Sequence, residues 1–388
     1  MALEELTEEQ VKQRRQRIKV AEPLEENNIE TSEDRKQEFI SGTVDIEYES
    51  LGRFSTPAKL SFKDYSTMDI NAIVMSTPDK LVKTLVPILN GMICGEHAGK
   101  FDVSNMTVEE FIETLVAVKG KFNSRYHKHP YMCECQYDKP QDEQKFQDIT
   151  VDLGSLKYKS IEQVDEEIRA TYKKDIEALT EEEWNEYKKS YAAIHNIDEN
   201  IVTKEMTLEN IKVTEPFVIN PDGHEIALRL IRISDVIKAQ ELLDKEYNVL
   251  IKRIQNRQEH GVSGEDLKIK KQNEIEELEK EKAKKLLLYI KAFSLISIDG
   301  KQLTDAEKIK AMLDRDIFPN RVSQDINSLL DELKFGVFDT IEFNCSFCGQ
   351  ENKEDLQHNI SVTELLPLNS KNERDSRHLT RLNIRFGA

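Results

Sequence analysis

Four of the five cysteines in this 388-residue chain lie in two closely spaced pairs. Cys345 and Cys348 form a CxxC motif followed by Gly349, and Cys133 and Cys135 form a CxC motif in the first half of the chain. A tight CxxCG turn after a strand points two thiolates to one place, and thiolates are good ligands for Zn²⁺. The motif is therefore typical of one half of a zinc ribbon.

A structural zinc ion needs four ligands, and the sequence holds no second CxxC motif. Cys133 and Cys135, His358 or another chain could complete the site. A local set of His127, His129, Cys133 and Cys135 is a further candidate, although CxC spacing suits zinc less well. The alternatives are a metal-free turn held by hydrogen bonds and a redox pair. The redox pair is less favoured, because the motif does not lie at a helix N-terminus, which would lower the pKa of a thiol. No other cofactor is predicted.

The remaining candidates for chemistry favour structural roles. Cys94 is predicted to be a small core residue in an apolar helix. His224 lies in a turn and is predicted to be exposed. Nothing in the sequence places a nucleophile or an orienting carboxylate beside His127 and His129, so they are interpreted as structural. The sequence contains no phosphate loop, no dinucleotide fingerprint, no HExxH helix and no GxSxG turn. The prediction is therefore that the protein is not an enzyme.

Composition favours protein partners over nucleic acid or membrane. The formal net charge is −18, so the chain repels phosphate backbones. The basic stretch from Lys12 to Lys19 is interpreted as one face of an exposed helix. No run approaches the ~20 apolar residues of a membrane span, and the acidic first residues do not form a secretory signal. Sparse cysteines indicate reduced thiols or metal ligands in a cytosol.

The periodicity of apolar residues predicts an α+β protein made of two mainly helical modules. Each module is expected to carry a small β-hairpin with a zinc-ribbon-like knuckle. A helical hairpin at 235–293, packed at its base and exposed at its tip, is predicted inside the second module. The predicted ranges are an N-terminal arm at 1–39, a first module at 40–205, a second module at 206–368 and a C-terminal extension at 369–388.

Local signals mark the ends of the elements. A helix is predicted to start at Thr77-Pro78, and Tyr126–Tyr137 is interpreted as a turn-like segment. The turn-rich NPDGHE stretch at 220–225 predicts a hairpin. Alternating apolar residues predict strands at 39–48 and around 149–153. Three capping boxes are predicted to begin helices: Thr107 with Glu110, Thr180 with Glu183, and Thr304 with Glu307.

The two halves share an order of features, which predicts one module used twice. Each half has an apolar helix, a turn, a capped helix, a cysteine pair and a strand. The strand is ITVDLGSL from Ile149 in the first half and ISVTELL from Ile360 in the second. A stripe of Trp184, Tyr187 and Tyr191 along one helical face is interpreted as packing on the protein's own body.

From about Leu286 onward the chain shows a resemblance to a known family. A capped helix precedes a strand ending in FNCSFCGQEN, and a further strand runs into LLPL. This order resembles the T4-type phage baseplate protein family, which includes small hub and tail assembly proteins with the same strand–CxxCG–strand ending. The first half, from Asn105 through Cys133, looks like a degenerate copy in which CxxCG has become CEC followed by Gln136.

The resemblance implies a structural component of a contractile phage tail, in or near the baseplate. Such a virion component would be assembled in the host cytoplasm and bind other tail and baseplate proteins, in many copies within a symmetric assembly. One alternative is a transient assembly chaperone, and a remote one is a zinc-dependent enzyme that uses Cys345, Cys348 and a histidine. The sequence RHLTRLNIRFGA at 377–388 alternates apolar and basic residues and is predicted to add a strand or clamp to a neighbour.

Overall fold

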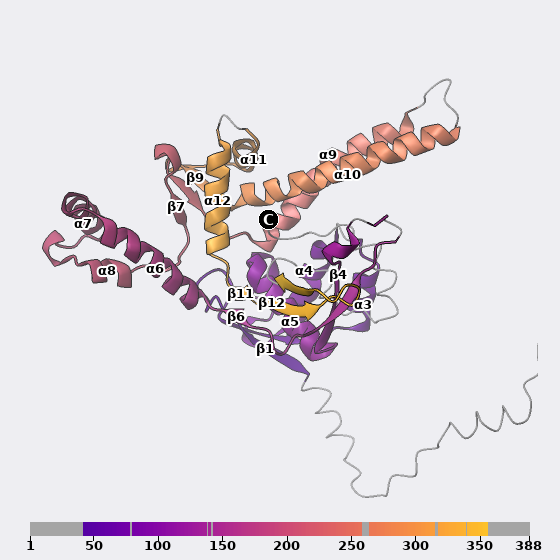
Figure 1. Ribbon diagram of the computed structural model, residues 1–388, viewed down its shortest axis with the longest axis horizontal. Coiled ribbons are helices and arrows are strands. Elements are labelled where there is room, and N and C mark those ends of the chain that lie inside the picture. Colours follow the sequence, from indigo (N-terminus) through magenta and orange to yellow (C-terminus); the bar gives the residue numbers. More distant parts are fainter. Residues whose placement is uncertain are drawn as a thin grey trace, which may run out of the picture. The chain divides into compact units, whose positions relative to one another are not determined.

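A computed structural model describes residues 42–77, 80–137, 139–140, 143–257, 264–314, 317–338 and 340–355. The described chain is α+β, as predicted, with helices and short antiparallel strands (Figure 1). The predicted arm at 1–39 and extension at 369–388 lie outside the described residues. The helices are α3 (Thr67–Val74), α4 (Leu81–Met92), α5 (Val108–Phe122), α6 (Ile161–Ala178), α7 (Glu181–His195), α8 (Lys204–Glu209), α9 (Ile233–Asn256), α10 (Gly264–Ser294), α11 (Asp305–Leu313) and α12 (Asn320–Glu332).

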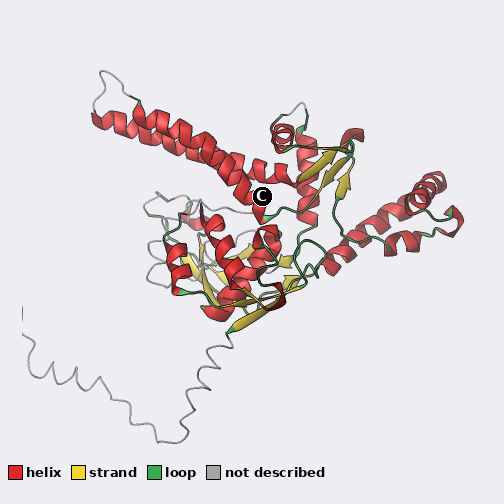
Figure 2. Cartoon of the chain, turned by 180° about the vertical axis from the view of Figure 1, so that it is seen from behind, coloured by secondary structure: helices red, strands yellow, loops and turns green. Residues whose placement is uncertain are grey.

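The strands form several small antiparallel sheets rather than one large one (Figure 2). The orders are β1-β2-β3, β10-β9-β8-β7, β11-β6, β12-β13 and β4-β5. The strands are β1 (Thr43–Glu47), β2 (Lys59–Lys63), β3 (Ile93–Cys94), β4 (Tyr126–Tyr131), β5 (Gln147–Asp152), β6 (Tyr158–Lys159), β7 (Phe217–Ile219), β8 (Ile226–Leu228), β9 (Leu295–Ile298), β10 (Lys301–Gln302), β11 (Gly336–Val337), β12 (Thr340–Asn344) and β13 (Glu351–Asp355).

Side-chain caps explain where several helices begin. Thr107 accepts a hydrogen bond from the Glu110 N–H, and the Glu110 carboxylate accepts one from the Thr107 N–H. The same reciprocal pair, which satisfies two otherwise free N–H groups, begins α7 at Thr180 and α11 at Thr304. The three predicted capping boxes are therefore confirmed.

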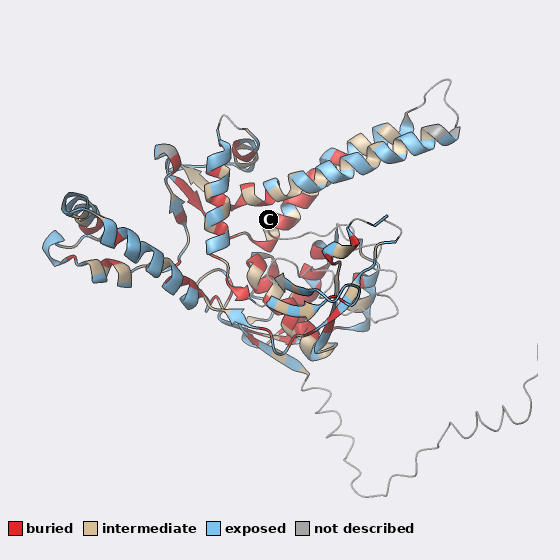
Figure 3. Cartoon of the chain, viewed as in Figure 1, coloured by how far each residue is buried: buried red, intermediate tan, exposed pale blue. Residues whose placement is uncertain are grey.

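Two large cores lie beneath these elements (Figure 3). The first gathers β1–β3, α4, α5 and β5 together with the start of α9 and the end of α10. The second gathers β7–β9, α11 and α12 with the start of α6. Ile233 from the predicted second module lies in the first core, and Ile161 from the predicted first module lies in the second core. The boundaries drawn from the sequence stay predictions.

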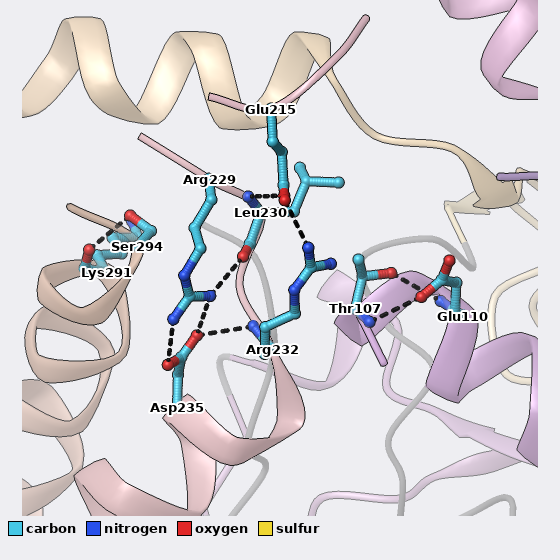
Figure 4. Close-up of polar contacts among 9 residues, drawn as sticks. All are labelled: Thr107, Glu110, Glu215, Arg229, Leu230, Arg232, Asp235, Lys291 and Ser294. Carbon is cyan, nitrogen blue, oxygen red and sulfur yellow. Dashed lines mark hydrogen bonds and ion pairs between the residues drawn. The ribbon is translucent and has the colours of Figure 1, made fainter. Parts of the chain in front are cut away.

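The helices α5 and α9 begin side by side at a buried polar junction (Figure 4). The N–H of Ile233 donates to the Met106 carbonyl at 3.0 Å. Asp235 accepts two hydrogen bonds from the Arg229 guanidinium, at 2.7 and 2.8 Å, and one from the Arg232 N–H. Paired charges are the form in which ionised groups tolerate burial. The hydrogen bond to Met106 joins the start of α9 to the chain just before α5, and α5 is followed by β4.

The predicted helical hairpin is present as the antiparallel pair α9 and α10 (Figure 1). At its base, Val236 and Leu243 of α9 and Phe293 of α10 are buried in the first core. Toward the outer end, Arg257, which follows α9, pairs with Glu274 of α10 at 2.9 Å. The apolar base and charged outer part match the predicted arrangement.

The aromatic stripe lies on α7, beside α8. Trp184 stacks on Tyr187, with ring centroids 5.7 Å apart, and the Lys204 ammonium lies 5.3 Å from the Trp184 ring centre. Tyr191, Ala192 and Val202 form a small separate core, and Trp184 packs against it. Trp184 and Tyr191 thus pack within the chain, as predicted, whereas Tyr187 is exposed.

Three predicted element assignments need correction. Tyr126–Tyr131, interpreted as turn-like, is strand β4, because it pairs with β5 residue by residue. Helix α4 begins at Leu81 with Lys80 as its N-cap, not at Thr77. Cys94 is a half-buried residue of strand β3 rather than part of a helix, since α4 ends at Met92 and the chain then becomes extended and pairs with β2.

Candidate metal centre

The two cysteine pairs, more than 200 residues apart in the sequence, meet at one point. The sulfur atoms of Cys133, Cys135, Cys345 and Cys348 all lie within 4.8 Å of one another. The Sγ of Cys133 lies 3.8 Å from that of Cys348, and the Sγ of Cys135 lies 3.9 Å from that of Cys345. These separations are far longer than the ~2.05 Å of a disulfide, so the four thiols are free.

The CxxC pair lies on the turn between β12 and β13. The N–H of Cys345 donates to the Gln350 carbonyl and the N–H of Gly349 donates to the Cys345 carbonyl, both at 2.8 Å. Gly349 has a φ of +74°, which a residue without a Cβ adopts at little cost. The Phe347 N–H points at the Cys345 sulfur, 3.4 Å away. The turn therefore brings both sulfur atoms to one side and gives one of them a hydrogen-bond donor.

The CxC pair lies in the loop between β4 and β5, so both cysteine pairs follow the first strand of a hairpin. Cys133 is the N-cap of a 3₁₀ turn at Glu134–Gln136. The Gln136 N–H donates to the Cys133 carbonyl at 2.9 Å, and its buried side-chain amide donates to the Cys135 sulfur at 3.2 Å. The tight turn compensates for the shorter CxC spacing by aiming both thiols toward the second hairpin.

Side chains of the two hairpins hold the cysteine pairs together. The Gln147 side chain accepts from the Ser346 N–H at 2.6 Å and donates to the Asn344 carbonyl at 3.1 Å. The rings of Tyr131 and Phe343 pack edge to face, with centroids 4.7 Å apart. Aromatic pairs of this geometry stabilise by about 0.5–1.5 kcal/mol beyond area burial. The centre is therefore positioned by contacts that do not depend on the sulfur atoms.

Asn352 is a further residue of the site that the sequence reasoning did not single out. Its side-chain oxygen lies 3.2 Å from the Tyr131 hydroxyl and 3.7 Å from the Cys133 sulfur. Gln147 was missed in the same way. Both side chains bond to partners about 200 residues away, and no local pattern in the sequence marks them.

The electrostatics of the centre differ from one thiol to the next. Burial alone would raise the pKa of Cys345, but the N–H groups of Phe347 and Cys348, with the neighbouring thiols, lower it to about 7. Hydrogen bonding to the Cys135 backbone lowers the pKa of Cys133, but burial and the nearby Cys135 and Cys345 thiols raise it on balance. At neutral pH Cys345 is therefore partly ionised, and the thiolate is the form that binds metal.

The donor set fits a tetrahedral zinc ion. A zinc–sulfur bond of about 2.3 Å places tetrahedral thiolates about 3.8 Å apart, close to the 3.8 and 3.9 Å between the two cross-hairpin pairs. In the described part of the chain these four cysteines are the group with metal-binding geometry. His127 lies outside it, beside the Lys119 ammonium at 3.0 Å. His358 lies outside the described residues, and the backbone of His129 lies in β4.

Comparison with known proteins adds no assignment: no protein family, characterised sequence or solved structure matches this chain significantly. Among the described helices, none combines the length and apolarity that crossing a membrane requires.

Proposed function

We propose that this chain is a non-enzymatic structural component of a contractile phage tail, in or near the baseplate, that acts through contacts with other proteins. Within it, Cys133, Cys135, Cys345 and Cys348 hold a structural zinc ion. The observation that carries the proposal is the convergence of four thiols from two hairpins far apart in sequence. The assignment to a phage tail is supported by the strand–CxxCG–strand resemblance.

A structural role for zinc follows from the number of thiols. Catalytic zinc sites keep one coordination position for water or substrate, whereas structural sites fill all four positions with protein ligands. Four cysteines would fill all four coordination positions of the ion, so its role here would be to crosslink the β4–β5 and β12–β13 hairpins. Such a crosslink suits a protein that must keep its shape while its outer helices contact neighbours.

Metal analysis of a matched pair of variants tests the zinc proposal. The purified chain should hold one zinc per molecule, measured by elemental mass spectrometry. Cys345→Ser should lose the zinc and unfold at lower temperature, because one missing ligand weakens the whole site. Cys94→Ser, outside the cluster, should keep the metal. Equal metal content in both variants would exclude the four-cysteine site.

The place of the protein in the particle is tested separately. Quantitative mass spectrometry of purified mature virions should find the chain at a fixed copy number, a multiple of three or six. A structural component remains in the particle, so absence from virions with abundance in infected cells would instead assign the chain to transient tail assembly.

A further inference from the structure

Three exposed aromatic side chains lie on the two loops that carry the four cysteines. Tyr137 is 56% exposed, Phe146 62% and Phe347 43%. The segments that carry them lie side by side, because the Ser346 N–H beside Phe347 donates to the Gln147 side chain beside Phe146, and the Gln144 side chain donates to the Tyr137 carbonyl. We call these three residues the aromatic rim. Exposed apolar side chains gathered on neighbouring segments are typical of interaction sites.

Carboxylates outnumber ammonium groups along the sequence on either side of the aromatic rim residues. Within four residues of one of its rings, the described chain carries four carboxylate and two ammonium side chains, and one ammonium, that of Lys139, is already held by the Gln136 side chain at 3.0 Å. Four thiolates around a Zn²⁺ would add further negative charge. An occupant of this surface should therefore be cationic and able to stack on rings. The charged residues are Glu134, Glu143, Asp148 and Glu351, with Lys139 and Lys145.

The chain itself contains a segment with this chemistry. Residues 377–388 include Arg377, Arg381 and Arg385 and no acidic residue. Arginine both stacks on aromatic faces and pairs with carboxylates, which lysine does less well. We propose that residues 377–388 dock on the aromatic rim of the same chain. This inference deepens the proposed protein-contact role and rests on it, since the same surface would be exposed to a partner when the segment leaves.

Chain length favours docking within one molecule. The last described residue, Asp355, ends the strand that leaves the CxxC turn, and 21 residues separate it from Arg377. At about 3.3 Å per residue those residues can easily span the distance back to the turn. A tether of this length gives an effective concentration on the order of 1 mM, so even weak contacts keep the rim covered.

Hydrogen exchange of the full chain tests this docking. Amides of residues 377–388 should exchange about tenfold or more slowly in the wild type than in a Phe146→Ser/Phe347→Ser variant. Tyr126→Ser, an exposed aromatic at the other end of β4, is the matched control and should retain the protection. Arg381→Lys should weaken the protection, and Arg381→Glu should remove it.

The outcomes separate this proposal from the zinc proposal. Zinc content is measured in each sample, and wild type and rim variants are compared in the same metal state, so docking is decided even if no metal binds. Equal exchange in wild type and rim variant would overturn the docking. Protection that disappears on about hundredfold dilution would overturn docking within one chain and assign the segment to a second copy.

Discussion

At the scale of single residues, Glu113 is a buried acid without a cationic partner among the groups that shift its pKa. Its side chain is almost fully buried and accepts one hydrogen bond from the Glu49 N–H at 3.2 Å. A Cβ on Gly336 would lie 2.7 Å from its other oxygen, and Gly336 has a φ of +86°, so a side chain at that position would be strained. Burial, together with the charges of Glu110, Glu49 and Glu109, raises the pKa of Glu113 well above 4.5.

This burial predicts a pH-dependent cost. Above pH 4.5 the carboxyl ionises in the unfolded chain, while the folded chain keeps its proton, so unfolding releases a proton. Stability therefore falls as pH rises, by up to about 1.4 kcal/mol per pH unit, until the folded pKa is passed. Glu113→Gln removes this slope. In denaturant unfolding at several pH values, the free energy of unfolding of the variant should increase relative to that of the wild type as pH rises. A difference that stays constant with pH would contradict the prediction.

The residues of the metal centre show what a sequence can and cannot reveal. The types and spacing of Cys345 and Cys348 predicted a zinc knuckle, since the turn that they need is local. The choice of Cys133 and Cys135 as partners was one of several, because nothing local states which distant segments meet. Gln147 and Asn352 carried no signal for the same reason.

At the scale of elements, the stability of the α9–α10 pair depends on the buried residues at its base. Leu243 of α9 is fully buried in the first core, whereas Leu288 of α10 is exposed. Leu243→Ala should lower the free energy of unfolding by about 2–5 kcal/mol, because it leaves a cavity at the base of the α9–α10 pair. Leu288→Ala should cost less than about 0.5 kcal/mol. Chemical denaturation measures both, and equal losses would show that the base does not anchor the helices.

Elements with strong local signals were predicted well, and those without them were not. The caps at Thr107 and Thr304 and the 3.6-residue period of α9 lie within a few residues, so each could be identified. Strand β4 was missed because its sequence, YHKHPY, is polar and contains Pro130. Its strand conformation comes from pairing with β5, a tertiary effect that overrides local preference.

At the scale of the whole molecule, the chain crosses between its cores several times. Val337 lies in the first core although Phe335 lies in the second. Strand β11 at this crossing pairs with β6 of the first half. Sequence reasoning treats neighbouring residues as one module, so it could predict an α+β protein with two cysteine hairpins but not the shared cores.

The proposed zinc ion links the two halves at one further place, and its removal should have a local effect. Chelation should increase amide exchange in β4–β5 and β12–β13, because the fourfold crosslink between the two hairpins would be lost. The α9–α10 pair should exchange as before, since its base is buried in the first core, which contains none of the four cysteines. Hydrogen exchange before and after chelation measures this, with re-added zinc as the reversal control. Increased exchange throughout the molecule would mean that zinc supports global folding, and no change would mean that the hairpins are held by Gln147, Tyr131 and Phe343 alone.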